Sequence, residues 1–193
     1  GLGNSIFTTA GYRAVWSGDK FVAVGEGTNT IAYSYDGIDW SLPSSTVFST
    51  RGNGVAWSGD KFVAVGEGTN DIAYSVDGIN WNSGKGTLFD GGVARAVGAG
   101  QGIYGTVYIA VGDLGTYSDS RISMDGITWK QILSGDSESY TTFDSPRDIA
   151  FGAGKFVAVG TNTFEDSVAV FFDGGGVGVG GSDWYRTFGT GFG

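Results

Sequence analysis

Residues 16–40 read WSGDKFVAVGEGTNTIAYSYDGIDW, and residues 57–81 read WSGDKFVAVGEGTNDIAYSVDGINW. The two stretches differ at only three positions, and their first and last tryptophans are each 41 residues apart. Self-similarity at a fixed period of this length is the signature of a repeat architecture, in which each repeat forms one supersecondary unit. The fold of the chain therefore follows from what one repeat forms.

Two further copies of the repeat follow with more changes. The third contains YIAVG at 108–112 and RISMDGITW at 121–129, and the fourth contains KFVAVG at 155–160 and VAVFFDG at 168–174. In the third and fourth copies, Gly98 and Phe151 hold the position of the early tryptophan. We expect a single domain over 1–193, with repeats at approximately 10–50, 51–90, 91–144 and 145–193.

Each repeat divides into short strands separated by turn residues. In the first copy we expect strands at 13–16, 20–24, 30–34 and from 38 onwards, because apolar and polar residues alternate there. Asp-Gly between alternating segments is a strong hairpin signal. Four strands per unit of about 41 residues is typical of a β-propeller blade. The prediction is an all-β propeller of four-stranded antiparallel blades. A closed ring of four blades is slightly favoured, and an excerpt of a longer array stays open.

Composition excludes several classes of function. The 193 residues contain no cysteine and no histidine, which excludes disulfides, Ser-His-Asp and Cys-His catalysis and the usual His/Cys zinc sites. The net charge of −9 disfavours nucleic acid and anionic membranes as partners, and no apolar run is long enough for membrane insertion. The loop carboxylates of the third repeat match no calcium-loop spacing. We expect neither a metal nor a cofactor.

Three copies of the repeat end in Ser-x-Asp-Gly-x-x-Trp. This pattern resembles the Asp-box (BNR) motif of sialidase-like propellers, although it is one residue shorter than the usual form. The resemblance implies a structural role, in which the carboxylate accepts turn N–H groups and the tryptophan packs across the hairpin. The residues are Ser34, Asp36, Gly37 and Trp40, then Ser75, Asp77, Gly78 and Trp81, then Ser123, Asp125, Gly126 and Trp129.

The sequence of the repeats outside this motif resembles repeats of large algal and protist DNA viruses and of phage fibre proteins. The phrases that carry it include RGNGVAW, FVAVGEGTN and IAYSxDGIxW, and the match covers residues 1–81 closely and 91–184 loosely. The resemblance implies a virion-surface or extracellular location. Our first hypothesis is a non-enzymatic module for adhesion or receptor binding, with a glycan or a protein as receptor. The second is a purely structural capsid or fibre component whose partners are other virion or fibre subunits. The third is a sialidase-like glycosidase.

Candidate binding residues fall into two groups. Arginines stand near the start of the first strand of each repeat, which lines the central channel of a propeller; Arg13 and Arg95 are taken as equivalent and as ligand candidates. Salt bridging with Asp148 and its neighbours is the alternative for these arginines. Tyr104, Tyr117 and Tyr140 lie in non-repeated insertions, which tend to form loops on a binding face. We assign no catalytic residue.

Overall fold

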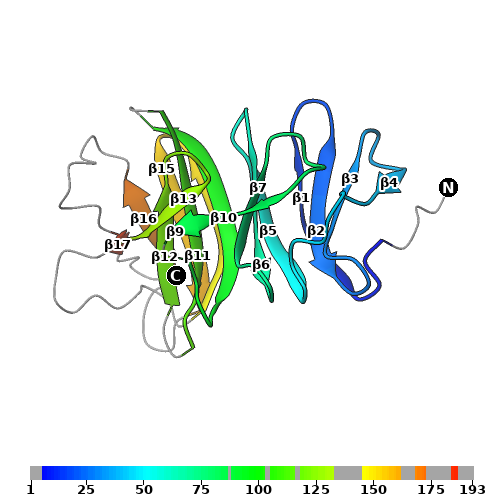
Figure 1. Cartoon of the computed structure of the whole chain (residues 1–193). Helices are drawn as coiled ribbons and strands as arrows, with labels where there is room; N and C mark the ends of the chain where they lie inside the picture. The colour runs from blue at the N-terminus through cyan, green and yellow to red at the C-terminus, as the bar shows by residue number, and fades with distance from the viewer. Residues whose placement is uncertain are drawn as a thin grey trace, which may run out of the picture.

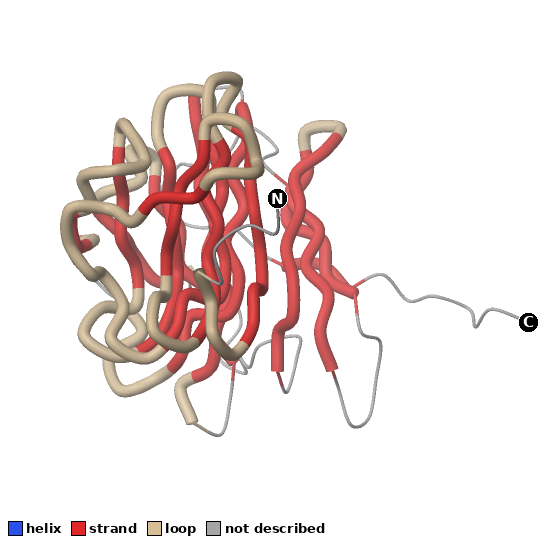
Figure 2. Tube along the Cα trace, turned by 90° about the vertical axis from the view of Figure 1, so that its right-hand side faces the viewer, coloured by secondary structure: helices blue, strands red, loops and turns tan. Residues whose placement is uncertain are grey.

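A computed structural model of the chain describes residues 6–86, 88–102, 105–115, 118–132, 145–161, 168–172 and 184–186. The described residues form strands and loops, and they include no helix that could cross a membrane (Figure 2). The strands form four-stranded antiparallel blades that follow the chain order. This arrangement confirms the predicted all-β propeller fold.

The four blades share one plan, in which consecutive strands pair from first to fourth. Blade 1 contains β1 (Ala10–Trp16), β2 (Phe21–Glu26), β3 (Ile31–Ser34) and β4 (Trp40–Ser41). Blade 2 contains β5 (Arg51–Trp57), β6 (Phe62–Glu67), β7 (Ile72–Ser75) and β8 (Asn82–Ser83). Blade 3 contains β10 (Val93–Gly102), β11 (Gly105–Asp113), β12 (Ser118–Ser123) and β13 (Thr128–Gln131). Blade 4 contains β14 (Ser145–Gly152), β15 (Lys155–Thr161), β16 (Val168–Phe172) and β17 (Trp184–Arg186).

Short contacts join blades at their edges. The short strand β9 (Lys85–Gly86), which follows blade 2, pairs in parallel with β13 of blade 3. Glu26 at the end of β2 pairs with Arg51 at the start of β5. The first strands approach so closely that a Cβ on Gly54 would lie 3.2 Å from the Cα of Ala96. The close approach therefore favours a glycine where β5 meets β10.

Apolar side chains hold each blade against the next. Val22 and Val24 of blade 1 share a buried cluster with Val55, Phe62 and Trp81 of blade 2. The same arrangement joins blade 2 to blade 3, and a third cluster joins blade 3 to blade 4. Burial of this apolar surface is the main favourable contribution to folding in each case.

The four blades form an arc that runs from blade 1 to blade 4 (Figures 1 and 2). Among the described residues, three apolar clusters join successive blades and no such cluster joins blade 4 to blade 1. The described blades thus form an open arc, and not the closed four-bladed ring that the sequence slightly favoured. Its closure would need a fourth interface between the end blades.

Candidate functional site

A β-bulge occurs in the first strand of every blade. The strand register shifts between Gly11 and Arg13 in β1 and at equivalent points in the other three first strands, so that one residue in each is left without a partner. Bulges re-aim side chains and are frequent beside functional sites. The four extra residues are Tyr12, Asn53, Arg95 and Arg147.

The register corrects the expected equivalence of two arginines. Arg13 lies opposite Val24, whereas Ala96, and not Arg95, lies opposite Val111. Arg95 is therefore the equivalent of Tyr12. The cause is one extra residue in the turn before β10, where the Gly92 N–H donates to the Phe89 carbonyl. The same shift places Ala99, and not Gly98, at the position of the early tryptophan.

Carboxylates at the ends of the second strands hold arginines of the neighbouring first strands. The Arg51 Nε donates to Glu67 at 2.8 Å, and a terminal nitrogen of Arg51 lies 4.0 Å from Glu26. The Arg95 Nε donates to Asp113 at 2.7 Å. Glu26 also accepts a hydrogen bond from the Tyr12 hydroxyl, which raises the pKa of that tyrosine. We call this set the inner rim: Tyr12, Glu26, Arg51, Glu67, Arg95 and Asp113.

Arg13 reaches across the inside of the arc. It pairs with Asp148 of blade 4, the residue at the equivalent position of that blade's first strand. The salt bridge that was the alternative to ligand binding is thus present. Both side chains stay about 40% exposed, so the pair is open to solvent and contributes little to stability.

With Arg13 added to the inner rim, its three arginines combine fixed geometry with exposure. Their side chains are 40% exposed at Arg13, 29% at Arg51 and 33% at Arg95. An arginine oriented by one carboxylate still has further N–H donors, which can bind a carboxylate or a carbonyl of a partner. The rim can therefore recognise acidic or main-chain groups.

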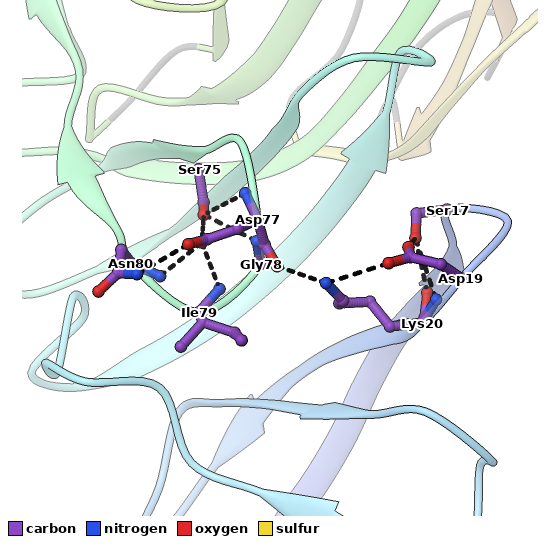
Figure 3. Close-up of polar contacts among 8 residues, drawn as sticks. All are labelled: Ser17, Asp19, Lys20, Ser75, Asp77, Gly78, Ile79 and Asn80. Atoms are coloured by element: carbon purple, nitrogen blue, oxygen red, sulfur yellow. Dashed lines mark hydrogen bonds and ion pairs between the residues drawn. The ribbon is translucent and has the colours of Figure 1, made fainter.

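The serines and aspartates of the three Ser-x-Asp-Gly turns make one shared set of hydrogen bonds. In blade 2, Asp77 accepts the N–H groups of Ile79 and Asn80 at 2.8 and 2.7 Å, and Ser75 accepts the Gly78 N–H at 2.8 Å (Figure 3). Gly78 has a φ of 72°, in the left-handed region that favours glycine. Trp81 closes the turn by donating its Nε1 to the Gly78 carbonyl at 3.1 Å.

These hydrogen bonds control the pKa of the turn aspartates. Burial works to raise the pKa of Asp77, but the Asn80 and Ile79 donors and the Ser75 hydroxyl outweigh it and hold the pKa well below its usual range. The pKa of Asp36 is lowered by the N–H groups of Asp39 and Ile38. These side chains face their own turn, which gives them a structural task.

The Ser-Gly-Asp-Lys segment forms a polar clamp between blades that the sequence analysis did not assign. Lys20 of blade 1 donates its Nζ to the main-chain carbonyl of Asp77 in blade 2 at 3.0 Å, and Asp19 lies 3.2 Å from the same Nζ (Figure 3). Lys61 of blade 2 donates to the Asp125 carbonyl of blade 3 at 2.9 Å. The signal in the sequence was the repetition of the segment itself.

The remaining candidates are placed as follows. Tyr104, Tyr117 and Tyr140 lie outside the described residues. Arg147 is an exposed bulge residue of β14. In the described part of the chain, no three acidic side chains come together in a group that could hold a metal ion. Asp119, which was expected in a loop, lies in strand β12 and pairs with Arg121 at 2.7 Å.

Comparisons with known proteins bear on the fold. No protein-family model matches the chain, and no curated protein matches its sequence. The chain is similar to a solved structure described as "YCF48 bound to D1 peptide", with a TM-score of 0.59 and 17% sequence identity. The match covers 92% of this chain and 55% of that one, so the chain spans about half the length of this β-propeller neighbour.

Proposed function

We propose that the chain is a non-enzymatic propeller module that binds a protein receptor through the inner rim, at the surface of a virion or outside a cell. The observation that carries the proposal is the row of carboxylate-held arginines that stay 29–40% exposed. The preferred segment is an extended peptide with carboxylates, because each guanidinium can bind one of them.

Two further observations support this reading. The β-propeller neighbour is itself described as bound to a peptide. The wording of the repeats resembles viral and phage fibre repeats, which favours a location on a virion or outside a cell.

Selection from a phage-displayed random peptide library tests the proposal. Selected peptides should be enriched in Asp and Glu, and their affinity for Arg51→Gln and Arg13→Gln should fall at least about tenfold, the effect of losing one charge-assisted hydrogen bond. Lys130→Gln, on the exposed fourth strand of blade 3, is the matched control and should bind as the parent does. Equal binding by all three variants would contradict the assignment of the rim.

A glycan array run beside the library separates the other receptor class. A reproducible glycan hit that is lost in Tyr104→Ala, Tyr117→Ala and Tyr140→Ala, with no selected peptides, would move the binding face to the insertions. We expect no turnover of fluorogenic glycosides in the same preparations.

A purely structural role as a capsid or fibre component is the second candidate, and one observation favours it. The second residue of each Ser-x-Asp-Gly turn is apolar and exposed, at 60% for Tyr35, 67% for Val76 and 43% for Met124. Such a row fits contacts with other subunits. Replacing all three by serine should abolish assembly with fibre subunits while leaving peptide binding at the rim intact.

A further inference from the structure

The three interfaces between blades follow one rule. The face of a blade that lies toward the next blade in the chain is called its trailing face, and an apolar pair of the second strand stands at its centre. The face of the next blade that covers it is called the leading face. In blades 1 to 3 these pairs are Val22 and Val24, Val63 and Val65, and Ile109 and Val111, and each of these side chains is at most 2% exposed. The same contact is thus made three times by nearly the same residues.

The leading faces repeat as well. Their first-strand residue, opposite the conserved alanine of the second strand, is Val55 in blade 2, Val97 in blade 3 and Ile149 in blade 4. These three are 5–6% exposed. The position is therefore buried wherever a preceding blade packs against it.

Among the described residues, no blade covers the leading face of blade 1 or the trailing face of blade 4. In blade 4 the apolar pair is Val157 and Val159, and Val159 is 38% exposed, whereas its equivalents in the other blades are buried. In blade 1 the first-strand residue is Ala14, which is exposed, and Trp16 beside it is 45% exposed. The two ends of the described arc thus expose one trailing face and one leading face, the two kinds of face that pack together between successive blades.

We propose that the trailing face of blade 4 binds the leading face of blade 1 of a second copy of this chain, head to tail. The apolar contact is Val157 and Val159 against Ala14 and Phe21, as Val22 and Val24 contact Val55 and Phe62 inside the chain.

Sedimentation velocity over a concentration series, with light scattering for mass, tests the proposal. The parent chain should form species of at least twice its 20.0 kDa mass. Val159→Lys and Ala14→Lys should each be monomeric, because either places a charge in the contact. Asn82→Lys, at an exposed position of β8, is the matched control and should associate as the parent does. Circular dichroism should show all variants folded, since the three positions are exposed.

Mixing distinguishes the geometry of the contact. Val159→Lys keeps its leading face and Ala14→Lys keeps its trailing face, so an equimolar mixture should form heterodimers through the one intact pair. A parent that stays monomeric at every concentration would overturn the proposal. So would association of Val159→Lys at the parent's strength, because two leading faces would then be binding each other.

Discussion

Asp71 of blade 2 occupies the position that Thr30 holds in blade 1, directly before the third strand of its blade. Thr30 is buried and donates its hydroxyl to the Phe48 carbonyl at 2.9 Å. A carboxylate cannot donate that hydrogen bond. Burial, with a smaller contribution from the charge of Asp90, raises the pKa of Asp71 to about 6. Asp71 therefore destabilises the second repeat relative to the threonine that the first repeat has at this position.

Asp71→Thr should stabilise the protein at neutral pH. The folded pKa of Asp71 lies above the unfolded value, so the folded state binds more protons between about pH 4 and pH 6 and stability falls as pH rises through this window. We expect Asp71→Thr to gain about 1–2 kcal/mol at pH 7 and nothing below pH 4. Urea unfolding at several pH values measures the gain, and Thr30→Asp is the reciprocal control that should lose stability. A gain that persists unchanged at low pH would contradict the titration of Asp71.

Blade 3 meets the same problem with a buried ion pair. Asp119 stands at the Thr30 position, and Arg121 stands where blades 1 and 2 have Ala32 and Ala73. Both side chains are at most 7% exposed. Arg121→Ala should cost about 3–5 kcal/mol, because it leaves the aspartate buried without its partner.

The double variant Asp119→Thr with Arg121→Ala restores the residue pair of blade 1. Replacing both charges together is expected to be near neutral, since the desolvation cost disappears with the pair. Chemical unfolding of the two single variants and the double variant gives the coupling. Additive losses in the double variant would show that the two residues act independently.

The clamp between blades 1 and 2 should contribute measurably to stability. Lys20→Met keeps the apolar stem but removes the charged donor to the Asp77 carbonyl, which we expect to cost about 1.5–3 kcal/mol. Lys61→Met should behave alike at the next interface, and Lys130→Met at an exposed site should change little. Thermal unfolding at constant pH compares the three. Equal melting temperatures for Lys20→Met and Lys130→Met would show that the clamp is energetically neutral.

Asp77→Ala should weaken the protein at neutral pH and reduce its sensitivity to acid. The pKa of Asp77 is depressed in the fold, so its contribution is present above the unfolded pKa of about 4 and is lost as pH falls below it. Loss of the turn hydrogen bonds should cost about 1–2 kcal/mol at pH 7. Unfolding measured from pH 7 down to pH 2 tests this, with Asp39→Ala as the exposed control. A constant difference at all pH values would contradict the mechanism.

The repeat itself accounts for what could be predicted. Two nearly identical copies reveal the strands and turns, because Asp36-Gly37 and Asp77-Gly78 stand at the same hairpin position in both copies. The register of Arg95 could not be read by counting, because one inserted residue before β10 shifts every later position of that strand. An insertion of one residue in a turn leaves no composition signal.

Contacts between blades were harder to predict than contacts within them. The target of Lys20 is a main-chain carbonyl 57 residues away, and a carbonyl is the same in every residue. The open arc could not be predicted either, because the angle between blades depends on how closely their first strands approach, as at Gly54 and Ala96, and not on the strand pattern. Sequence periodicity specifies the unit, while packing specifies how units are joined.

Lys20 and Lys61 each donate a hydrogen bond to a main-chain carbonyl of the neighbouring blade. The residue that supplies the carbonyl could therefore be replaced without loss of the hydrogen bond. A gene duplication that adds one blade would bring both the lysine and an acceptor with it, and a later substitution of the acceptor residue would leave its carbonyl in place. Lineages of such proteins can therefore lengthen, shorten and diversify blade by blade while the joints between blades stay compatible.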